Sequence, residues 1–341
     1  MDFERVTVTP MRDTPYVDAK PPEGEEILSI LRAVGHERAL VDPDLTARLT
    51  DLLEAAAIRA TALPDGVVVR VTKRAVKDVL RCEADFVASL GLEQAASIFA
   101  IRGQLLDYVF GHVVTESPLG VSPTNDGLSA AAAACDDQLL QIWELLTDEE
   151  RDDVRYVVDR LGAALAQRWP ALPVNARFRL QETLRVELAG GRVGLTGRVD
   201  IVLGQPTGER VGTTLVDVKA GKRGYGDVDD AWWYALLETI RHRAQPLQVG
   251  NYYLADGHLS LQQVTAEILY ERTVVTARAV ERLVSLALGD KPTITPNDLC
   301  QWCPVFEDCG PGRAFAEAQG ADLAPRPELD DHAEEGLNDD F

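Results

Sequence analysis

Three residues in this sequence have the types and spacing needed to hydrolyse a phosphodiester bond. Asp217 and Lys219 stand two apart in the run LVDVKAG, and Asp200 ends the earlier run GRVD. Side chains two apart on a strand point to the same face, so Asp217 and Lys219 should project together. An isolated Asp-x-Lys is most often a structural ion pair, but a second carboxylate beside it needs a cation, and oxygen ligands favour Mg²⁺ or Mn²⁺. A lysine beside metal-bound water completes a hydrolytic site.

Three cysteines near the end of the chain, in LCQWCPVFEDC, form a second candidate site. Cys300, Cys303 and Cys309 are spaced like metal ligands, and five cysteines in 341 residues indicate metal binding in a reducing compartment more than a disulfide framework. A closed zinc site or an iron–sulfur cluster takes four thiolates, so one ligand must come from elsewhere. Cys135, in SAAAACDDQLL, fits no ligand spacing, and we expect a small buried residue on a helix.

The pattern of β-rich runs and glycine turns predicts the strands that would position the two aspartates. Three β-rich runs, NARFRLQETLRVEL, RVGLTGRVDIVL and TTLVDVKAG, are separated by glycine turns and predict an antiparallel meander. A helix over about 229–244, two further strands and a helix over about 273–288 follow. This order predicts an α/β sandwich, with the cysteine run directly after its last helix.

Helices dominate the sequence before this sheet, up to Trp169. After the short strand GVVVRV, the stretch TKRAVKDVLRCEADFVASLG predicts a helix capped by Thr72, with Cys82 in it or just after it. Thr147 caps another helix, whose acidic first turn suits the helix dipole. Trp232 and Trp233 could stack on bases if exposed, but their position beside ALL on a helix favours the core.

The composition limits the class of protein. With 341 residues, 46% of them hydrophobic, the chain should form one large domain, or one domain with an appendage. It has no twenty-residue apolar run, and its start lacks the pattern of a signal peptide, so we expect a cytoplasmic protein with no membrane contact.

The net charge of −21 argues on its face against binding to nucleic acid, but the charge is uneven. Residues 317–341 hold nine Asp or Glu against one Arg, which predicts a disordered acidic tail. Elsewhere, basic residues come in short groups that could line a phosphate-facing groove only if they converge in space. These groups are Arg70, Lys73, Arg74, Lys77 and Arg81; Arg177, Arg179 and Arg185; Lys222 and Arg223; and Arg241 and Arg243.

The strand motifs and the cysteines together resemble a known family. GRVD, about sixteen residues, then VDVK is similar to the core motif of the PD-(D/E)XK nuclease superfamily. The similarity is to its RecB-like branch, which includes the iron–sulfur exonucleases of CRISPR adaptation and of the AddAB helicase–nucleases. TKRAVKDVLRCEADF is similar to the early cysteine motif of that branch, and the last three cysteines match its terminal pattern. The resemblance extends from about Val71 to Gly310 and implies a [4Fe–4S] cluster held by Cys82, Cys300, Cys303 and Cys309. Zinc on the same four thiolates stays open.

The resemblance also implies a fold and a function. The fold is a PD-(D/E)XK restriction-endonuclease-like core, with a central mixed sheet flanked by helices, helical N-terminal additions and a C-terminal iron–sulfur clasp. The domains would be 1–70, an N-terminal region of unknown role; 71–312, the nuclease with a helical insertion and the cluster; and 313–341, the acidic tail. The function is a Mg²⁺- or Mn²⁺-dependent deoxyribonuclease, an exonuclease on single strands or DNA ends in DNA repair, recombination or defence. A helicase or another DNA-processing protein would be a partner.

Two positions depart from the family pattern. The family's metal-binding histidine of a GxxxH helix is replaced by Asp107 in RGQLLDYVFGH, and His112, five residues on, is turned about 140° away. A family glutamine four residues before a tyrosine is replaced by Asp230, before Tyr234. Both changes are expected to add negative charge near the metal. The resemblance assigns the metal to Asp107, Asp200 and Asp217, and catalysis to Asp200, Asp217, Lys219 and Tyr234.

Two other classes of protein stay open at this point. One is a nuclease-fold subunit that binds DNA or assembles a complex, with decayed chemistry and a structural cluster, which the acidic balance and the two departures would suit. The other is a redox-sensing module that uses the electrons of the cluster. Metal-dependent DNA cleavage that is lost in Asp217→Ala and Lys219→Ala would separate the enzyme from both.

Overall fold

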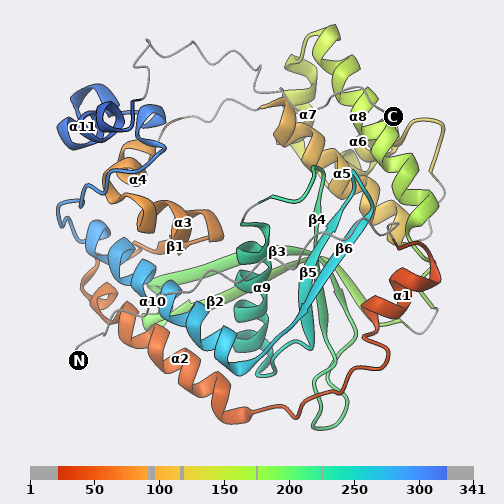
Figure 1. Cartoon of the computed structure of the whole chain (residues 1–341), viewed down its shortest axis with the longest axis horizontal. Helices are drawn as coiled ribbons and strands as arrows, with labels where there is room; N and C mark the ends of the chain where they lie inside the picture. Colours follow the sequence, from red (N-terminus) through yellow and green to blue (C-terminus); the bar gives the residue numbers. More distant parts are fainter. Residues whose placement is uncertain are drawn as a thin grey trace.

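A six-stranded mixed sheet forms the centre of the molecule (Figure 1). The computed structural model describes residues 22–90, 92, 97–115, 119–173, 176–224 and 226–320. The strands are β1 (Val69–Val71), β2 (Phe178–Leu188), β3 (Val193–Leu203), β4 (Thr214–Lys219), β5 (Gln248–Tyr253) and β6 (His258–Gln263). Their order is β1-β3-β4-β5-β6, and β2 pairs with β3.

The expected antiparallel meander is present as β2, β3 and β4. The β2–β3 connection turns through Gly190 and Gly191, whose φ angles of +64° and +87° are open to glycine at little cost. The parallel pairs β1–β3 and β4–β5 make the sheet mixed. The predicted α/β fold with a central mixed sheet flanked by helices is therefore confirmed.

Helices cover both faces of the sheet and bury two separate cores. One core contains α2 (Pro43–Ala57), α3 (Lys73–Arg81), α9 (Asp227–His242) and α10 (Ala266–Ala287). The other contains α1 (Glu25–Leu31), α5 (Ile98–Val114), α6 (Pro123–Ala133), α7 (Asp137–Leu145) and α8 (Asp148–Arg168). Successive residues of β4, Leu215 and Val216, enter different cores, as the period of two requires. Figure 1 shows α5 to α8 grouped together at one side of the sheet.

The helix caps expected from the sequence are formed. Thr72 accepts a hydrogen bond from the Ala75 N–H at 3.1 Å, and Thr147 forms a capping box with Glu150. Helix α10 begins seven residues earlier than the expected 273, because Thr265 caps it through the Ile268 N–H. The helix expected over 72–91 is instead two helices, α3 and α4 (Glu83–Ser89), because Cys82 between them is extended at φ −161°.

Cys135 does not lie buried on a helix, so that prediction is wrong. Helix α6 ends at Ala133, and Cys135 follows it in the left-handed conformation at φ +55°, with its side chain exposed. Its N–H donates to the Ala132 carbonyl, and the Asp136 N–H donates to the Ala131 carbonyl. This is a Schellman ending, in which the chain leaves the helix axis before the cysteine can enter the core.

The C-terminal part of the described chain returns to α3 and α4. Two short turns, η3 (Cys300–Trp302) and η4 (Phe306–Asp308), lead into α11 (Gly310–Ala318). The predicted tail 313–341 thus begins with helical residues, and residues 321–341 lie outside the described part of the chain. The domain boundaries at 70 and 312 stay predictions. Among the described helices, none is long and apolar enough to cross a membrane.

Candidate active site

Asp200 and Asp217 lie side by side on neighbouring antiparallel strands. The pairing of Ile201 with Val216 places the two aspartates opposite each other, and both are buried, with 6% and 5% of their surface exposed. Lys219 lies two residues further along β4, and its Nζ is 2.7 Å from Asp217 Oδ2. The structure thus brings together the two carboxylates and the lysine that the period-two pattern placed on one face.

Hydrogen bonds on both oxygens fix the Asp200 carboxylate. The Val218 N–H donates to Oδ2 at 2.6 Å, and Gln181 Nε2 donates to Oδ1 at 3.0 Å. Gln181 lies opposite Asp200 on β2, between the pairs formed by Leu180 and Glu182. Its φ of +49° is unusual for a non-glycine residue inside a strand and indicates local backbone strain. No signal in the sequence marks this residue, since QETLRVE is an ordinary strand pattern.

Asp107 reaches the same place from α5, which packs on α6 and α8. Its Oδ2 is 3.3 Å from Arg198 Nη2 on β3. Burial raises the pKa of Asp107 to about 6, with the charge of Asp217 adding to this rise and Arg198 opposing it. Burial, followed by the charges of Asp107 and Asp217, also raises the pKa of Asp200 well above its usual range. The three carboxylates therefore repel one another in a poorly solvated place.

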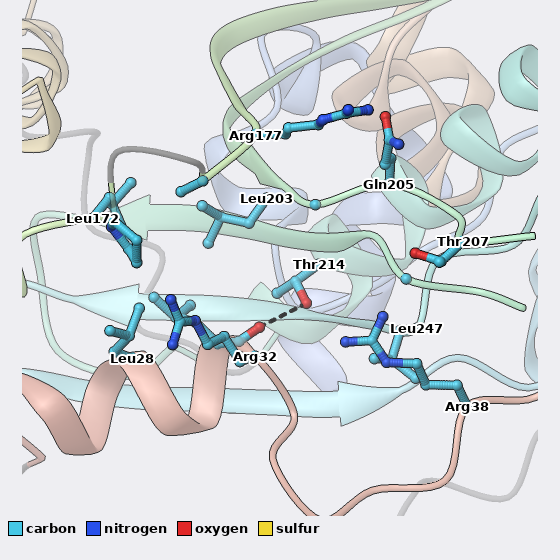
Figure 2. Close-up of a pocket in the computed structure, with 15 residues that line it drawn as sticks. Leu28, Arg32, Arg38, Leu172, Arg177, Leu203, Gln205, Thr207, Thr214 and Leu247 are labelled. Atoms are coloured by element: carbon cyan, nitrogen blue, oxygen red, sulfur yellow. Dashed lines mark hydrogen bonds between the residues drawn. The ribbon is translucent and has the colours of Figure 1, made fainter.

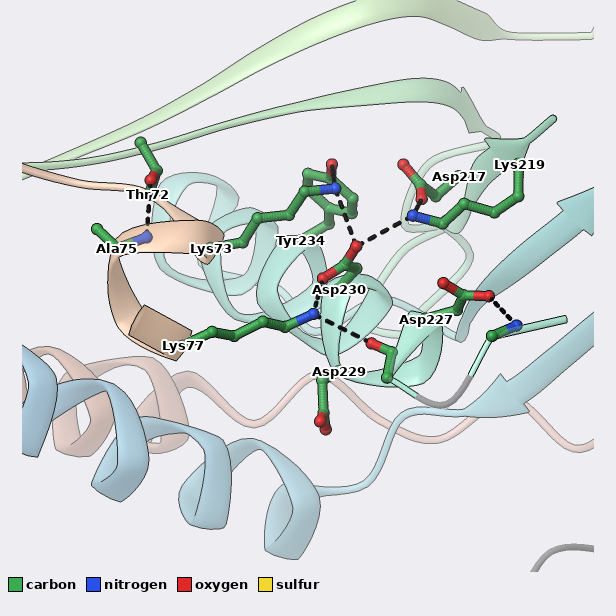
Figure 3. Close-up of polar contacts among 12 residues, drawn as sticks. Thr72, Lys73, Ala75, Lys77, Asp217, Lys219, Asp227, Asp229, Asp230 and Tyr234 are labelled. Atoms are coloured by element: carbon green, nitrogen blue, oxygen red, sulfur yellow. Dashed lines mark hydrogen bonds and ion pairs between the residues drawn. The ribbon is translucent and has the colours of Figure 1, made fainter. Parts of the chain in front are cut away.

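Asp230 is ionised, but three lysines surround its carboxylate, so the negative charge expected at this position is balanced locally. Its Oδ1 is 2.6 Å from Lys77 Nζ, and its Oδ2 is 3.1 Å from Lys73 Nζ and 3.0 Å from Lys219 Nζ. Burial would raise the pKa of Asp230, but the Lys77 hydrogen bond and the charges of Lys219 and Lys73 outweigh it and lower the pKa to about 2. Figure 3 shows Lys73 and Lys77 reaching from α3 to Asp230 on α9, with Lys219 coming from β4.

Tyr234 lies one helical turn after Asp230. Its hydroxyl accepts a hydrogen bond from Lys73 Nζ at 3.0 Å, and burial raises its pKa above the usual range. Trp232 and Trp233 are buried, as expected for core residues. The buried Nδ1 of His112 has no hydrogen-bond partner within the described part of the chain.

The carboxylates of Asp107, Asp200 and Asp217 have the chemistry that a hard divalent cation prefers. Among the described residues, no three His, Cys, Asp or Glu side chains are grouped in a way that could hold a metal ion as they stand. Lys219 lies against Asp217 and Arg198 against Asp107, so cationic side chains take up carboxylate oxygens that such an ion would use. The donors are all hard oxygens, and burial, followed by the charges of neighbouring carboxylates, raises the pKa of Asp107 and of Asp200, an effect that a cation would oppose.

The four candidate ligands for a cluster line one pocket between the α3–α4 joint and the C-terminal turns. They are Cys82, Cys300, Cys303 and Cys309, and none forms a disulfide.

Backbone N–H groups point at three of these four sulfurs. Thr295 donates to Cys82 Sγ at 3.5 Å, Asn297 to Cys300 Sγ at 3.2 Å and Gly312 to Cys309 Sγ at 3.4 Å. A Cβ on Gly312 would lie 3.1 Å from Cys309 Sγ, so a side chain would crowd this sulfur, while its 3.5 Å distance to Cys300 Sγ is an ordinary contact. The four thiols thus share a pocket that has N–H donors, although among the described residues no three of them are grouped closely enough to hold a metal ion as they stand.

The basic groups of the sequence converge in part. Lys73 and Lys77 contact Asp230, which also contacts Lys219 next to Asp217. Arg177 instead lines a different cavity together with Arg32, Arg38 and several leucines (Figure 2). None of the predicted catalytic residues lines that cavity.

A sequence model of the PD-(D/E)XK nuclease superfamily matches residues 70–310, which is more than half of the chain. The chain therefore belongs to the PD-(D/E)XK nuclease superfamily. Eleven solved chains show a significant match to this structure. One is the crystal structure described as "Putative exonuclease" from Eubacterium rectale, with 12% sequence identity, a TM-score of 0.40, and coverage of 72% of this chain and 88% of that chain. That similarity is too low to support an argument about function. No curated protein matches the sequence significantly.

Proposed function

We propose that this chain is a metal-dependent deoxyribonuclease that hydrolyses phosphodiester bonds in single strands or at DNA ends. One observation carries the proposal. In a member of a nuclease superfamily, buried Asp200 and Asp217 lie together with Lys219 on the neighbouring central strands β3 and β4, with Asp107 close to them.

Asp107, Asp200 and Asp217 would hold Mg²⁺ or Mn²⁺, which lowers the pKa of bound water and neutralises charge on phosphate. The hydrogen bonds from Gln181 and Val218 keep Asp200 in one orientation. Burial disfavours the charged form of Lys219, but Asp217 and Asp230 outweigh it and raise the pKa of this lysine. Lys219 therefore stays an ammonium group, which stabilises charge on the reacting phosphate and does not act as a general base.

Tyr234 acts through a lysine in this proposal. Its hydroxyl contacts Lys73 and stays protonated, since burial raises its pKa. Tyr234 is thus a positioning residue, and its removal should cost less than removal of Lys219.

We further propose that Cys82, Cys300, Cys303 and Cys309 hold a [4Fe–4S] cluster of the RecB-like branch. The shared pocket and the N–H donors to sulfur support it, and the resemblance of the cysteine spacing selects the cluster over zinc. A link that closes a loop of more than two hundred residues should stabilise the fold by about 5 kcal/mol in the chain-entropy estimate. Metal analysis and the visible absorption spectrum distinguish iron–sulfur from zinc.

The biological setting rests on the same resemblance. It consists of a role in DNA repair, recombination or defence in the cytoplasm, with a helicase or other DNA-processing partner. The alternative of a decayed nuclease subunit loses one of its supports, because the Asp230 charge is neutralised by three lysines.

Cleavage of end-labelled single-stranded and duplex DNA with Mg²⁺ or Mn²⁺ tests the activity. Asp217→Ala and Lys219→Ala should each lower the rate at least about 100-fold, the scale of losing one group that stabilises the transition state. Asp229→Ala is a matched control, because Asp229 is on the same helix as Asp230 but pairs with Arg272. Two results would refute the proposed nuclease activity. One is cleavage that persists in both Asp217→Ala and Lys219→Ala, and the other is a wild type that cleaves with neither Mg²⁺ nor Mn²⁺.

A further inference from the structure

Three ammonium groups from two distant segments meet at Asp230. Lys73 and Lys77 come from α3, about 150 residues before Asp230 in the chain, and Lys219 comes from β4. Each oxygen of the Asp230 carboxylate has its own α3 lysine, with Lys77 on Oδ1 and Lys73 on Oδ2. The carboxylate therefore holds the two ammonium groups in separate places (Figure 3).

The two α3 lysines face solvent, whereas their partner does not. The side chains of Lys73 and Lys77 are 35% and 45% exposed, and that of Asp230 is 11% exposed. An ammonium group has three N–H bonds. Lys73 uses two of them, on Asp230 and the Tyr234 hydroxyl, and Lys77 uses two, on Asp230 and the Gly226 carbonyl. Within the described part of the chain, each lysine thus has one N–H left for a ligand.

The charge of the chain makes this placement significant. A protein with a net charge of −21 repels a polyanionic strand, so strand binding needs cations gathered along its path. Lys219 contacts both Asp217 and Asp230, so it connects the two α3 lysines at Asp230 to the carboxylates of the candidate active site. Burial opposes the charge of Lys73, but Asp217 and Asp230 raise its pKa and keep it protonated.

We propose that Lys73 and Lys77 bind the phosphate backbone of a nucleic-acid strand next to the phosphate that is cleaved. This inference rests on the proposed nuclease function and adds the residues that hold the strand. An ammonium group is a compact point charge without the planar fork of arginine, so it should bind phosphate without reading the base sequence.

Binding measured apart from cleavage tests the inference. The probe is a fluorescently labelled single-stranded DNA twenty-mer, titrated with the Asp217→Ala protein in EDTA at several NaCl concentrations, and read by anisotropy. Lys73→Gln and Lys77→Gln should each weaken binding and reduce the slope of log K against log [NaCl] by about 0.7. The loss should be the same for oligonucleotides of different sequence.

Matched variants separate a phosphate contact from a structural ion pair. Lys77→Arg keeps the charge and should restore the slope, and Lys291→Ala, an exposed lysine elsewhere, should leave it unchanged. If Lys73→Gln does not fold, Lys77→Gln decides alone, since Lys77 is the more exposed of the two. Lysine variants that lose thermal stability but keep the DNA affinity and the salt slope of the Asp217→Ala parent would refute the inference. Binding that depends on the lysines, in a wild-type protein that does not cleave DNA with Mg²⁺ or Mn²⁺, would overturn the proposed nuclease activity but keep the phosphate contacts of Lys73 and Lys77.

Discussion

Replacing Asp107 with asparagine should stabilise the metal-free protein at neutral pH. Burial, with the charge of Asp217, raises the pKa of Asp107 from 3.8 to about 6. A tenfold change in proton affinity corresponds to about 1.4 kcal/mol, so the ionised carboxylate costs the folded state at most about 3 kcal/mol. Its side chain is 26% exposed, and solvent screening brings the expected gain for Asp107→Asn to about 1–3 kcal/mol.

The gain in stability from Asp107→Asn should depend on pH. Asp107 binds its proton more tightly in the folded state, so the stability it contributes is complete below pH 3.8 and is lost as the pH rises through about 6. The difference between Asp107→Asn and wild type should therefore be largest above pH 7 and vanish near pH 4. Urea unfolding in EDTA at pH 7.5 and at pH 4.5 measures it directly.

A control and a metal titration complete the experiment. Asp51→Asn changes an exposed aspartate on α2 and should alter neither the stability nor its pH dependence. Mg²⁺ or Mn²⁺ should stabilise the wild type more than Asp107→Asn, because the bound ion needs the carboxylate. An Asp107→Asn protein that is less stable than wild type at pH 7.5 without metal would refute the reasoning, as would a difference that does not vary with pH.

Three further substitutions probe the groups around the site. Gln181→Leu removes the 3.0 Å hydrogen bond to Asp200 and should raise the Mn²⁺ concentration for half-maximal cleavage about 10- to 100-fold; an unchanged titration would remove Gln181 from the site. Cys300→Ala should abolish the visible absorption and lower the stability together, whereas Cys135→Ala should keep both; a colourless Cys300→Ala protein of full stability would exclude a structural cluster. Tyr234→Phe deletes the hydroxyl that accepts a lysine hydrogen bond and should lower the cleavage rate less than about 10-fold; a loss as large as that of Lys219→Ala would make it a catalytic residue.

The sequence predicts the features that depend on local period and local hydrogen bonds. Asp217 and Lys219 share a face because a strand has a period of two, and Thr72 caps α3 because a hydroxyl at that position can accept the Ala75 N–H. Features that depend on tertiary structure are not accessible in the same way. Gln181 has a φ of +49° inside a strand, which no local pattern favours.

The basic part of the site could not be predicted from the sequence either, because its residues lie far apart along the chain. Lys73 and Lys77 look like surface charges on a polar helix, and nothing near them in the sequence indicates that α3 packs beside the start of α9. Asp230 alone therefore suggests an added negative charge, whereas two of its three lysine partners lie about 150 residues away in the sequence. A charge can be assigned to a site from the sequence only when all of its neighbours are local.

The site has an acidic half and a basic half, and Lys219 belongs to both. Its ammonium group contacts Asp217, beside Asp200, and also Asp230, which α3 neutralises. The aspartate in the glutamine position of the family is therefore part of a cation network with Lys73, Lys77 and Lys219. Because Lys219 is held from both sides, removing Asp230 should release the ammonium group toward Asp217, where it would compete more strongly with a bound cation. In the proposed nuclease, Asp230 would thus keep Lys219 between the two aspartates.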